Sequence, residues 1–150
     1  MDICFAIFID IHRFLIYNNV MVDIPIRITQ KVLIIEDDQD LAKMYKNHLE
    51  GVGCQVLHVD DGRKGFETAK AEKPDVILLD LRLPGMYGID VLKLLKGDPD
   101  TKKIVVFVLT NMLYPDEREN IKDLGAVDIF IKAETTPGKI SDLIKQYFAK

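Results

Sequence analysis

The sequence is poor in the features that mark several large classes of protein. It has only two cysteines, Cys4 and Cys54, which are too few for a disulfide framework and too far apart for a zinc-binding pair. It also lacks a run of about 20 apolar residues suitable for a membrane span, because Asp10 and Arg13 interrupt the apolar stretch near the N-terminus. A reduced, cytoplasmic protein without a membrane span is therefore expected.

An excess of positive charge is also absent. Twenty Lys and Arg residues against 24 Asp and Glu residues give a net charge of −4, which excludes a generally basic nucleic-acid binder. No Gly-Lys-Ser/Thr of a nucleotide-binding loop and no Gly-X-Ser-X-Gly of a hydrolase occurs. At 150 residues, 48% hydrophobic and 29% charged, the chain has the size and composition of one globular domain.

Residues 1–29 differ from the rest of the chain. They contain short apolar runs but no basic segment before them and no small-residue cleavage site after them, so a secretory signal is not indicated. Met21 offers a second plausible start. We expect residues 1–29 to be an extension that is poorly ordered, and residues 30–150 to form the folded domain.

From Lys31 onward, apolar runs typical of buried strands alternate with segments of helical periodicity. This alternation predicts a doubly wound α/β fold with five parallel strands and five helices. The expected strands are Val32–Ile35, Cys54–Val59, Val76–Leu79, Ile104–Leu109 and Val127–Ile131. The expected helices follow Asp38, Asp61, Gly88, Pro115 and Thr136.

Chemically active side chains stand where the expected strands end. Ligands of such sheets bind beyond the carboxyl ends of the strands, so functional side chains are expected at these ends. They are Glu36, Asp37 and Asp38, then Asp80, then Thr110, and finally Lys132 at the end of the last strand. Taken alone, the first acidic group would indicate no more than a solvated turn with a helix cap.

Carboxylates packed together resist ionisation unless a cation lies among them, and hard oxygen ligands suit Mg²⁺. One carboxylate could accept a phosphoryl group, while Thr110 and Lys132 contact the phosphoryl oxygens. His48 and His58 do not cluster with one another or with His12 in the sequence, and surface or structural roles are favoured for all three.

Residues 31–150 resemble the receiver domain of two-component response regulators. The resemblance rests on four segments in order: Val32–Asp38, Pro74–Gly88, Val108–Thr110 and Gly125–Lys132. It implies a flavodoxin-like fold, with the five strands of the domain in the order 2-1-3-4-5. It is closest in kind to stand-alone, chemotaxis-regulator-like receivers.

The resemblance also implies a role for each residue at the strand ends. Asp80 becomes the phosphoacceptor. Glu36, through a water molecule, Asp37 and Asp80 become Mg²⁺ ligands together with the backbone carbonyl of Arg82. Thr110 and Lys132 become the hydroxyl and the amine that contact the phosphoryl group, and Asp38 becomes a helix cap.

Three positions depart from the family pattern. Ile129 stands where a switching Tyr or Phe is usual, Ala133 replaces the usual proline after the lysine, and Asn111 follows Thr110 in place of a small residue. Because none of them is a phosphorylation residue, they bear on the output of the signal and not on the chemistry.

The resulting expectation is a signalling phosphoacceptor and not an enzyme, with at most slow autodephosphorylation. A histidine kinase or phosphotransfer protein would supply the phosphoryl group. A downstream protein would bind the face formed by the fourth helix, fifth strand and fifth helix, with no direct contact to nucleic acid. The alternative is a metal-dependent phosphohydrolase of similar fold. Such enzymes usually place a second acid two residues after the nucleophile, where this chain has Arg82.

Overall fold

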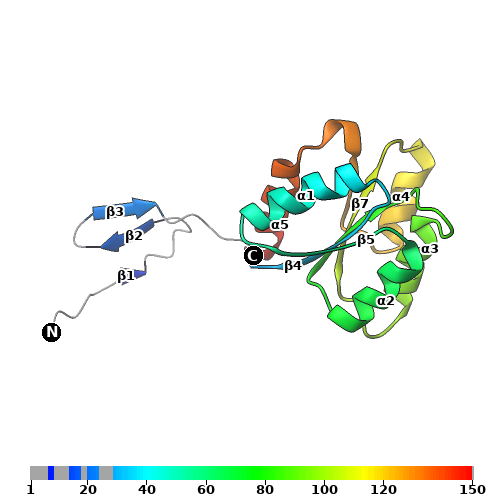
Figure 1. Ribbon diagram of the computed structural model, residues 1–150, viewed down its shortest axis with the longest axis horizontal. Helices are drawn as coiled ribbons and strands as arrows, with labels where there is room; N and C mark the ends of the chain where they lie inside the picture. The colour runs from blue at the N-terminus through cyan, green and yellow to red at the C-terminus, as the bar shows by residue number, and fades with distance from the viewer. Residues whose placement is uncertain (1–6, 9–13, 18–19, 24–28, 150) are drawn as a thin grey trace.

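The computed structural model describes residues 7–8, 14–17, 20–23 and 29–149 (Figure 1). From residue 31 to residue 148, strands and helices alternate along the chain. The strands are β4 (Lys31–Ile35), β5 (Gln55–Val59), β6 (Val76–Asp80), β7 (Val105–Thr110) and β8 (Asp128–Ile131). The helices are α1 (Gln39–Gly51), α2 (Gly62–Glu72), α3 (Gly88–Gly97), α4 (Pro115–Asp123) and α5 (Pro137–Phe148).

The five strands form one parallel sheet in the order β5-β4-β6-β7-β8. Counted along the domain this is the predicted order 2-1-3-4-5, so the expected doubly wound fold is confirmed. The change of direction in the strand order lies between β4 and β6, where their carboxyl ends form the crevice typical of ligand sites in such folds.

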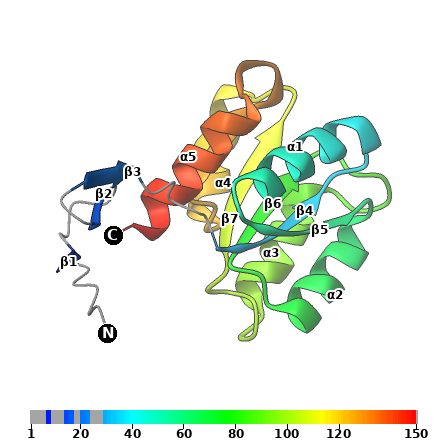
Figure 2. The same cartoon turned by 60° about the vertical axis from the view of Figure 1, so that its left-hand side comes forward.

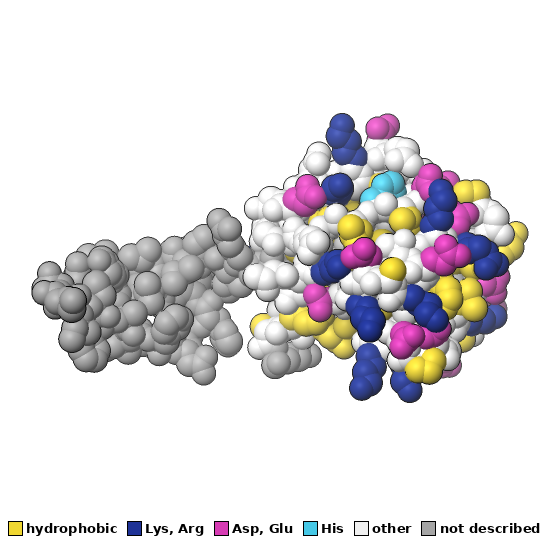
Figure 3. All heavy atoms as spheres, turned by 60° about the horizontal axis from the view of Figure 1, so that its bottom comes forward, with side chains coloured by type: hydrophobic (Ala, Val, Ile, Leu, Met, Phe, Trp, Pro, Cys, Tyr) yellow, Lys and Arg dark blue, Asp and Glu magenta, His cyan; other side chains and the backbone are white. Residues whose placement is uncertain are grey.

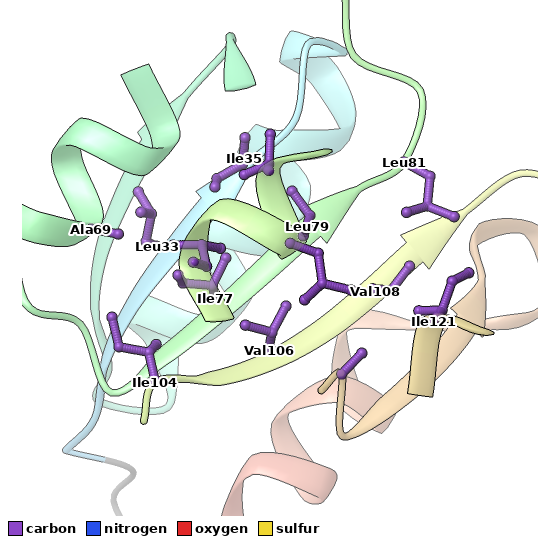
Figure 4. Packing of buried hydrophobic residues seen from close by; sticks show 14 of the residues in the cluster. Leu33, Ile35, Ala69, Ile77, Leu79, Leu81, Ile104, Val106, Val108 and Ile121 are labelled. Carbon is purple, nitrogen blue, oxygen red and sulfur yellow. The ribbon is translucent and has the colours of Figure 1, made fainter. Parts of the chain in front are cut away.

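Both faces of the sheet are covered by helices (Figure 2). Helices α1 and α5 pack on one face over a cluster that includes Ile34, Leu78 and Phe107. Helices α2, α3 and α4 pack on the other, where side chains of β4, β6 and β7 meet Ala69 of α2 and Ile121 of α4 (Figure 4). Burial on both faces explains why the strand sequences are continuous apolar runs and do not alternate with polar residues.

Three helix starts that the sequence predicts are present with their capping hydrogen bonds. The side chain of Asp38 accepts from the backbone N–H of Leu41, and that of Asp61 accepts from Lys64. Thr136 accepts from Lys139 in the same way, directly before Pro137. These polar side chains satisfy backbone donors that have no partner within the helix.

The structure corrects the sequence expectations at two places. Lys132 does not belong to the last strand, since β8 ends at Ile131 and a short 3-10 helix, η1 (Lys132–Glu134), follows. The helical spacing of Ile140, Ile144 and Tyr147 predicts that all three point inward, but the side chain of Tyr147 is exposed. The Tyr147 ring meets that of Phe107 in a T-shaped arrangement, with the ring centroids 6.3 Å apart.

Within residues 1–29, the structure places three short strands, β1 (Ile7–Phe8), β2 (Phe14–Tyr17) and β3 (Val20–Asp23). They pair antiparallel in a separate three-stranded sheet (Figure 1). Cys4, Asp10, His12 and Arg13 lie outside the described residues. The expectation that this extension is poorly ordered, and the boundary between residues 29 and 30, stay predictions.

Gly88 offers a test of how closely α3 packs against the strand end that carries Asp80. A Cβ atom at Gly88 would overlap the backbone oxygen of Asp80 and the Cα of Leu81. Gly88→Ala should therefore lower the free energy of unfolding by about 1–3 kcal/mol, as measured by urea denaturation.

Gly97→Ala is the matched control in the same helix, because nothing lies within 4 Å of a Cβ atom there. It should leave stability unchanged or raise it by up to about 1 kcal/mol. Equal stability of the two variants would contradict the packing described for Gly88.

Candidate functional site

The carboxyl edge of the sheet brings together the side chains that the sequence places at separate strand ends. Glu36 and Asp37 follow β4, and Asp80 is the last residue of β6. Thr110 is the last residue of β7, and Lys132 follows β8 directly. Because β4, β6, β7 and β8 are parallel neighbours, their ends lie side by side along one edge.

Three carboxylates form the acidic part of this site. One oxygen each from Glu36, Asp37 and Asp80 lie within 4.8 Å of one another. Glu36 and Asp80 are buried, with 2% of their surface exposed, whereas Asp37 faces solvent. Asp80 is further held by the backbone N–H of Arg82, which donates to its Oδ1 at 3.0 Å.

The Lys132 ammonium is the positive charge of the site. Its Nζ lies 2.6 Å from Oε2 of Glu36 and 3.2 Å from Oδ2 of Asp80. Burial lowers the pKa of Lys132, but its contacts with Glu36 and Asp80 outweigh this effect and hold the pKa above its ordinary value. One lysine therefore pairs with two buried carboxylates, which allows these like charges to lie close together.

The negative charge of the Glu36 carboxylate is only partly compensated by its surroundings. Burial raises the pKa of its carboxyl from 4.5 to about 7, the Lys132 ion pair opposes this rise, and the charge of Asp80 adds to it. Oε1 accepts from the backbone N–H of Asp38 at 3.1 Å. Oε2 lies against the Lys132 ammonium, which is its close partner within the described part of the chain.

The donor set fits a divalent cation. One oxygen from each of three carboxylates lies around one point, and the single ammonium of Lys132 opposes their charge. Hard oxygen ligands with room for water suit Mg²⁺. A cation among the carboxylates would also lower the pKa of Glu36 and so oppose the effect of burial.

The hydroxyl of Thr110 is buried and makes a hydrogen bond within the domain. Its Oγ1 donates to the backbone oxygen of Met112 at 2.8 Å, which ties the end of β7 to the loop that precedes α4. Asn111 and Met112 of this loop are exposed. Any movement of the Thr110 hydroxyl toward another acceptor would release this loop.

The departures from the family pattern have defined places. Ile129 is buried in the cluster under α2, α3 and α4, while its neighbour Phe130 lies in the opposite cluster. The alternation expected for a strand therefore holds here. Ala133 lies in η1 and is exposed.

Sequence reasoning missed one residue that contacts the site. His58 of β5 lies with Nε2 2.8 Å from the backbone oxygen of Glu36. The sequence offered only a histidine in an edge strand, two residues before Asp60, and no spacing rule that would join it to Glu36. The contact follows from the pairing of β4 with β5, which sets Ile34 opposite His58.

Known proteins share both the sequence pattern and the fold of this domain. The family model described as response regulator receiver domain matches residues 32–145. The chain belongs to this family. Its receiver domains are the phosphoacceptors of two-component signal transduction, and they bind Mg²⁺ at an acidic pocket.

Individual relatives agree with this assignment. The polar-differentiation response regulator DivK of Brucella ovis is 28% identical over 119 residues, which is 79% of this chain and 96% of that protein. The receiver domain of the DNA-binding response regulator merR from Colwellia psychrerythraea 34H is 30% identical. Its TM-score is 0.74, over 81% of this chain and 99% of that one.

A more distant receiver domain, that of the sensor histidine kinase PA1611 from Pseudomonas aeruginosa PAO1, was solved with a magnesium ion in its active-site cleft. It is 22% identical, with a TM-score of 0.73 over 82% of this chain and 100% of that chain. At this identity the similarity concerns the fold.

The receiver assignment makes this chain a phosphoacceptor signalling protein, as the sequence predicts, and gives no support to the phosphohydrolase alternative. Within the described residues, no helix combines the length and apolar composition needed to cross a membrane.

The raised pKa of Glu36 predicts a dependence of stability on pH. Its pKa of about 7 in the folded protein lies above the ordinary 4.5. The stability it contributes is therefore complete below about pH 4.5 and is lost as the pH rises through about 7. Relative to Glu36→Gln, the wild-type free energy of unfolding should fall by about 1–3 kcal/mol between about pH 5 and about pH 8.

The measurement is urea denaturation across this pH range in a buffer without divalent cations. Glu50→Gln, which replaces an exposed carboxylate of α1, is the control for loss of a carboxylate as such. A wild-type difference from Glu36→Gln that stays constant across the range would contradict the assignment of the raised pKa to Glu36.

Proposed function

We propose that Asp80 is the residue of this chain that becomes phosphorylated. The observation that carries this proposal is the position of its carboxylate, which is buried at the end of a central strand with Oδ1 held by a backbone N–H and Oδ2 beside Lys132. A carboxylate oxygen attacks the phosphorus of a phosphohistidine, the P–N bond breaks, and an acyl phosphate forms while the imidazole leaves.

The other side chains of the site serve this transfer. Lys132 neutralises charge on the phosphoryl oxygens, and the hydroxyl of Thr110 exchanges the Met112 carbonyl for one of these oxygens as its acceptor. The ligands of Mg²⁺ are Glu36, Asp37, Asp80 and the backbone carbonyl of Arg82. When bound, the ion supplies further positive charge to the phosphoryl oxygens.

The phosphoryl donor is a histidine kinase or a phosphotransfer protein of the cytoplasm, as the family assignment suggests. The protein acts as a signalling phosphoacceptor with at most slow autodephosphorylation. Arg82, two residues after Asp80, stands where related phosphohydrolases usually carry a second acid, which supports this reading. Positive and negative side chains are interspersed on the face shown in Figure 3, which favours a protein partner over nucleic acid.

We propose that a downstream protein binds the face formed by α4, β8 and α5. Helix α4 supports this role because Ile121 is its one buried residue, so its order costs little to change. Thr110 links the phosphorylation site to the loop before this helix through Met112. Ile129 is buried and β-branched, and it lacks the ring that swings between positions in many receivers.

Phosphorylation of Asp80 is tested with acetyl phosphate and Mg²⁺, followed by intact-mass measurement. The wild type should gain one phosphoryl group that is labile to acid and base, and Asp80→Asn should gain none. Asp75→Asn is the matched control, because Asp75 precedes the same strand at its opposite end. Equal labelling of Asp80→Asn and the wild type would overturn the assignment.

The metal assignment predicts that Asp37→Ala weakens Mg²⁺ binding at least about tenfold, because a ligand carboxylate is lost from a site with few protein ligands. The same variant should be more stable without Mg²⁺, since one negative charge leaves a crowded cluster. Calorimetric titration measures the affinity. Asp40→Ala removes a carboxylate from the first turn of α1 and should bind Mg²⁺ as the wild type does.

The output route predicts a local change in hydrogen exchange. Beryllofluoride, which mimics the phosphoryl group, should change the exchange of residues 111–124 by releasing Thr110 from Met112. Exchange in α2, on the other side of α3, should stay constant. Protection limited to the loop after Asp80, with residues 111–124 unchanged, would exclude this route.

A further inference from the structure

His58 is not one of the proposed phosphorylation residues, but its side chain contacts the backbone of one of them, Glu36. Strand β5 is the edge of the sheet, and β4 separates it from the strand that carries Asp80. Even so, Nε2 of His58 reaches the backbone oxygen of Glu36 at 2.8 Å. The ring is half-buried beside a cleft lined by Gln39, Val59, Asp60 and Lys64.

The backbone of Glu36 needs a donor at this point. The β4–β5 ladder continues one step past β4, where the N–H of Glu36 donates to the oxygen of Val59 at 3.0 Å. There the ladder stops, since β5 ends at Val59 and Asp61 caps α2. The imidazole of His58, in place of a backbone N–H, donates a hydrogen bond to the carbonyl of Glu36.

The contact also determines which ring nitrogen carries a proton. A backbone carbonyl can only accept, so Nε2 of His58 must be the N–H donor. This holds for the neutral ring and for the charged ring alike. The role of His58 therefore depends on a donor at one position and not on its charge.

Holding this carbonyl restricts the residue that follows. The oxygen of Glu36 belongs to the planar peptide group that joins Glu36 to Asp37. With the N–H bonded to Val59 and the carbonyl bonded to His58, both peptide groups that flank Glu36 have a fixed orientation. Asp37 is exposed, so its place in the carboxylate cluster depends on the backbone that carries it.

We propose that His58 is a positioning residue that orients the Glu36–Asp37 peptide so that both carboxylates face the same cation. This inference rests on the proposed function of these residues as Mg²⁺ ligands. Partners that orient metal ligands typically change metal affinity about 10- to 100-fold when they are removed. Because His58 acts through the backbone, the lower end of this range applies.

The test compares variants at position 58 in the full chain. His58→Leu replaces the ring with an apolar side chain of similar bulk that has no donor, and it should weaken Mg²⁺ binding about tenfold. His58→Gln offers an amide N–H at nearly the same distance from the backbone and should bind Mg²⁺ within about threefold of the wild type. Calorimetric titration with Mg²⁺ gives the affinity, and urea denaturation without Mg²⁺ gives the stability.

His48 provides the matched control. It is the other histidine of the described domain, and it is also half-buried and hydrogen-bonded, with Nε2 3.1 Å from Oγ of Ser141 between α1 and α5. His48→Leu should change stability without changing the affinity for Mg²⁺. A purely structural role of His58 would make both leucine variants behave alike.

The outcomes separate the two levels of the proposal. A wild type that binds no Mg²⁺ would overturn the proposed metal site, and this inference with it. If the wild type and His58→Leu bind Mg²⁺ with the same affinity, only the role of His58 is overturned. The same conclusion follows if His58→Leu and His58→Gln weaken Mg²⁺ binding equally. If His58→Leu does not fold, His58→Asn replaces it, because its amide is one methylene shorter than that of Gln and should weaken binding.

Discussion

Parallel pairing of neighbouring strands is the constraint on which the rest of this structure depends. It brings the ends of β4, β6, β7 and β8 to one edge of the sheet, so that residues far apart in the sequence become neighbours. The same pairing leaves both faces of the sheet to be covered by helices, which explains the apolar character of the strands. The stability of the core and the assembly of the site therefore have one common origin.

The site concentrates negative charge where water is scarce, and Lys132 is what the protein itself provides against it. Its ammonium contacts both Glu36 and Asp80, but burial still keeps the pKa of the Glu36 carboxyl high. Such an arrangement is not optimised for stability alone. It is suited to receiving further positive charge and a phosphoryl group, which is what receiver domains do.

The two sides of the site are connected to the rest of the domain in different ways. On the β5 side, the backbone of Glu36 is held by Val59 and His58, which gives a rigid support for the acidic residues. On the β7 side, the hydroxyl of Thr110 binds the loop before α4, a helix with a single buried residue. In the proposed function, this difference between the two sides would let phosphorylation of Asp80 alter the loop and helix that follow β7.

Much of this follows from the sequence alone, because strand periodicity and helix caps are local properties. The order of strands and helices, the caps at Asp38, Asp61 and Thr136, and the grouping of acidic residues at the strand ends were all predictable on that basis. The contact of His58 with Glu36, the hydrogen bond of Thr110 to Met112 and the exposure of Tyr147 were not. Those features depend on strand register, on loop geometry and on how the last turn of α5 packs, and only the tertiary structure determines them.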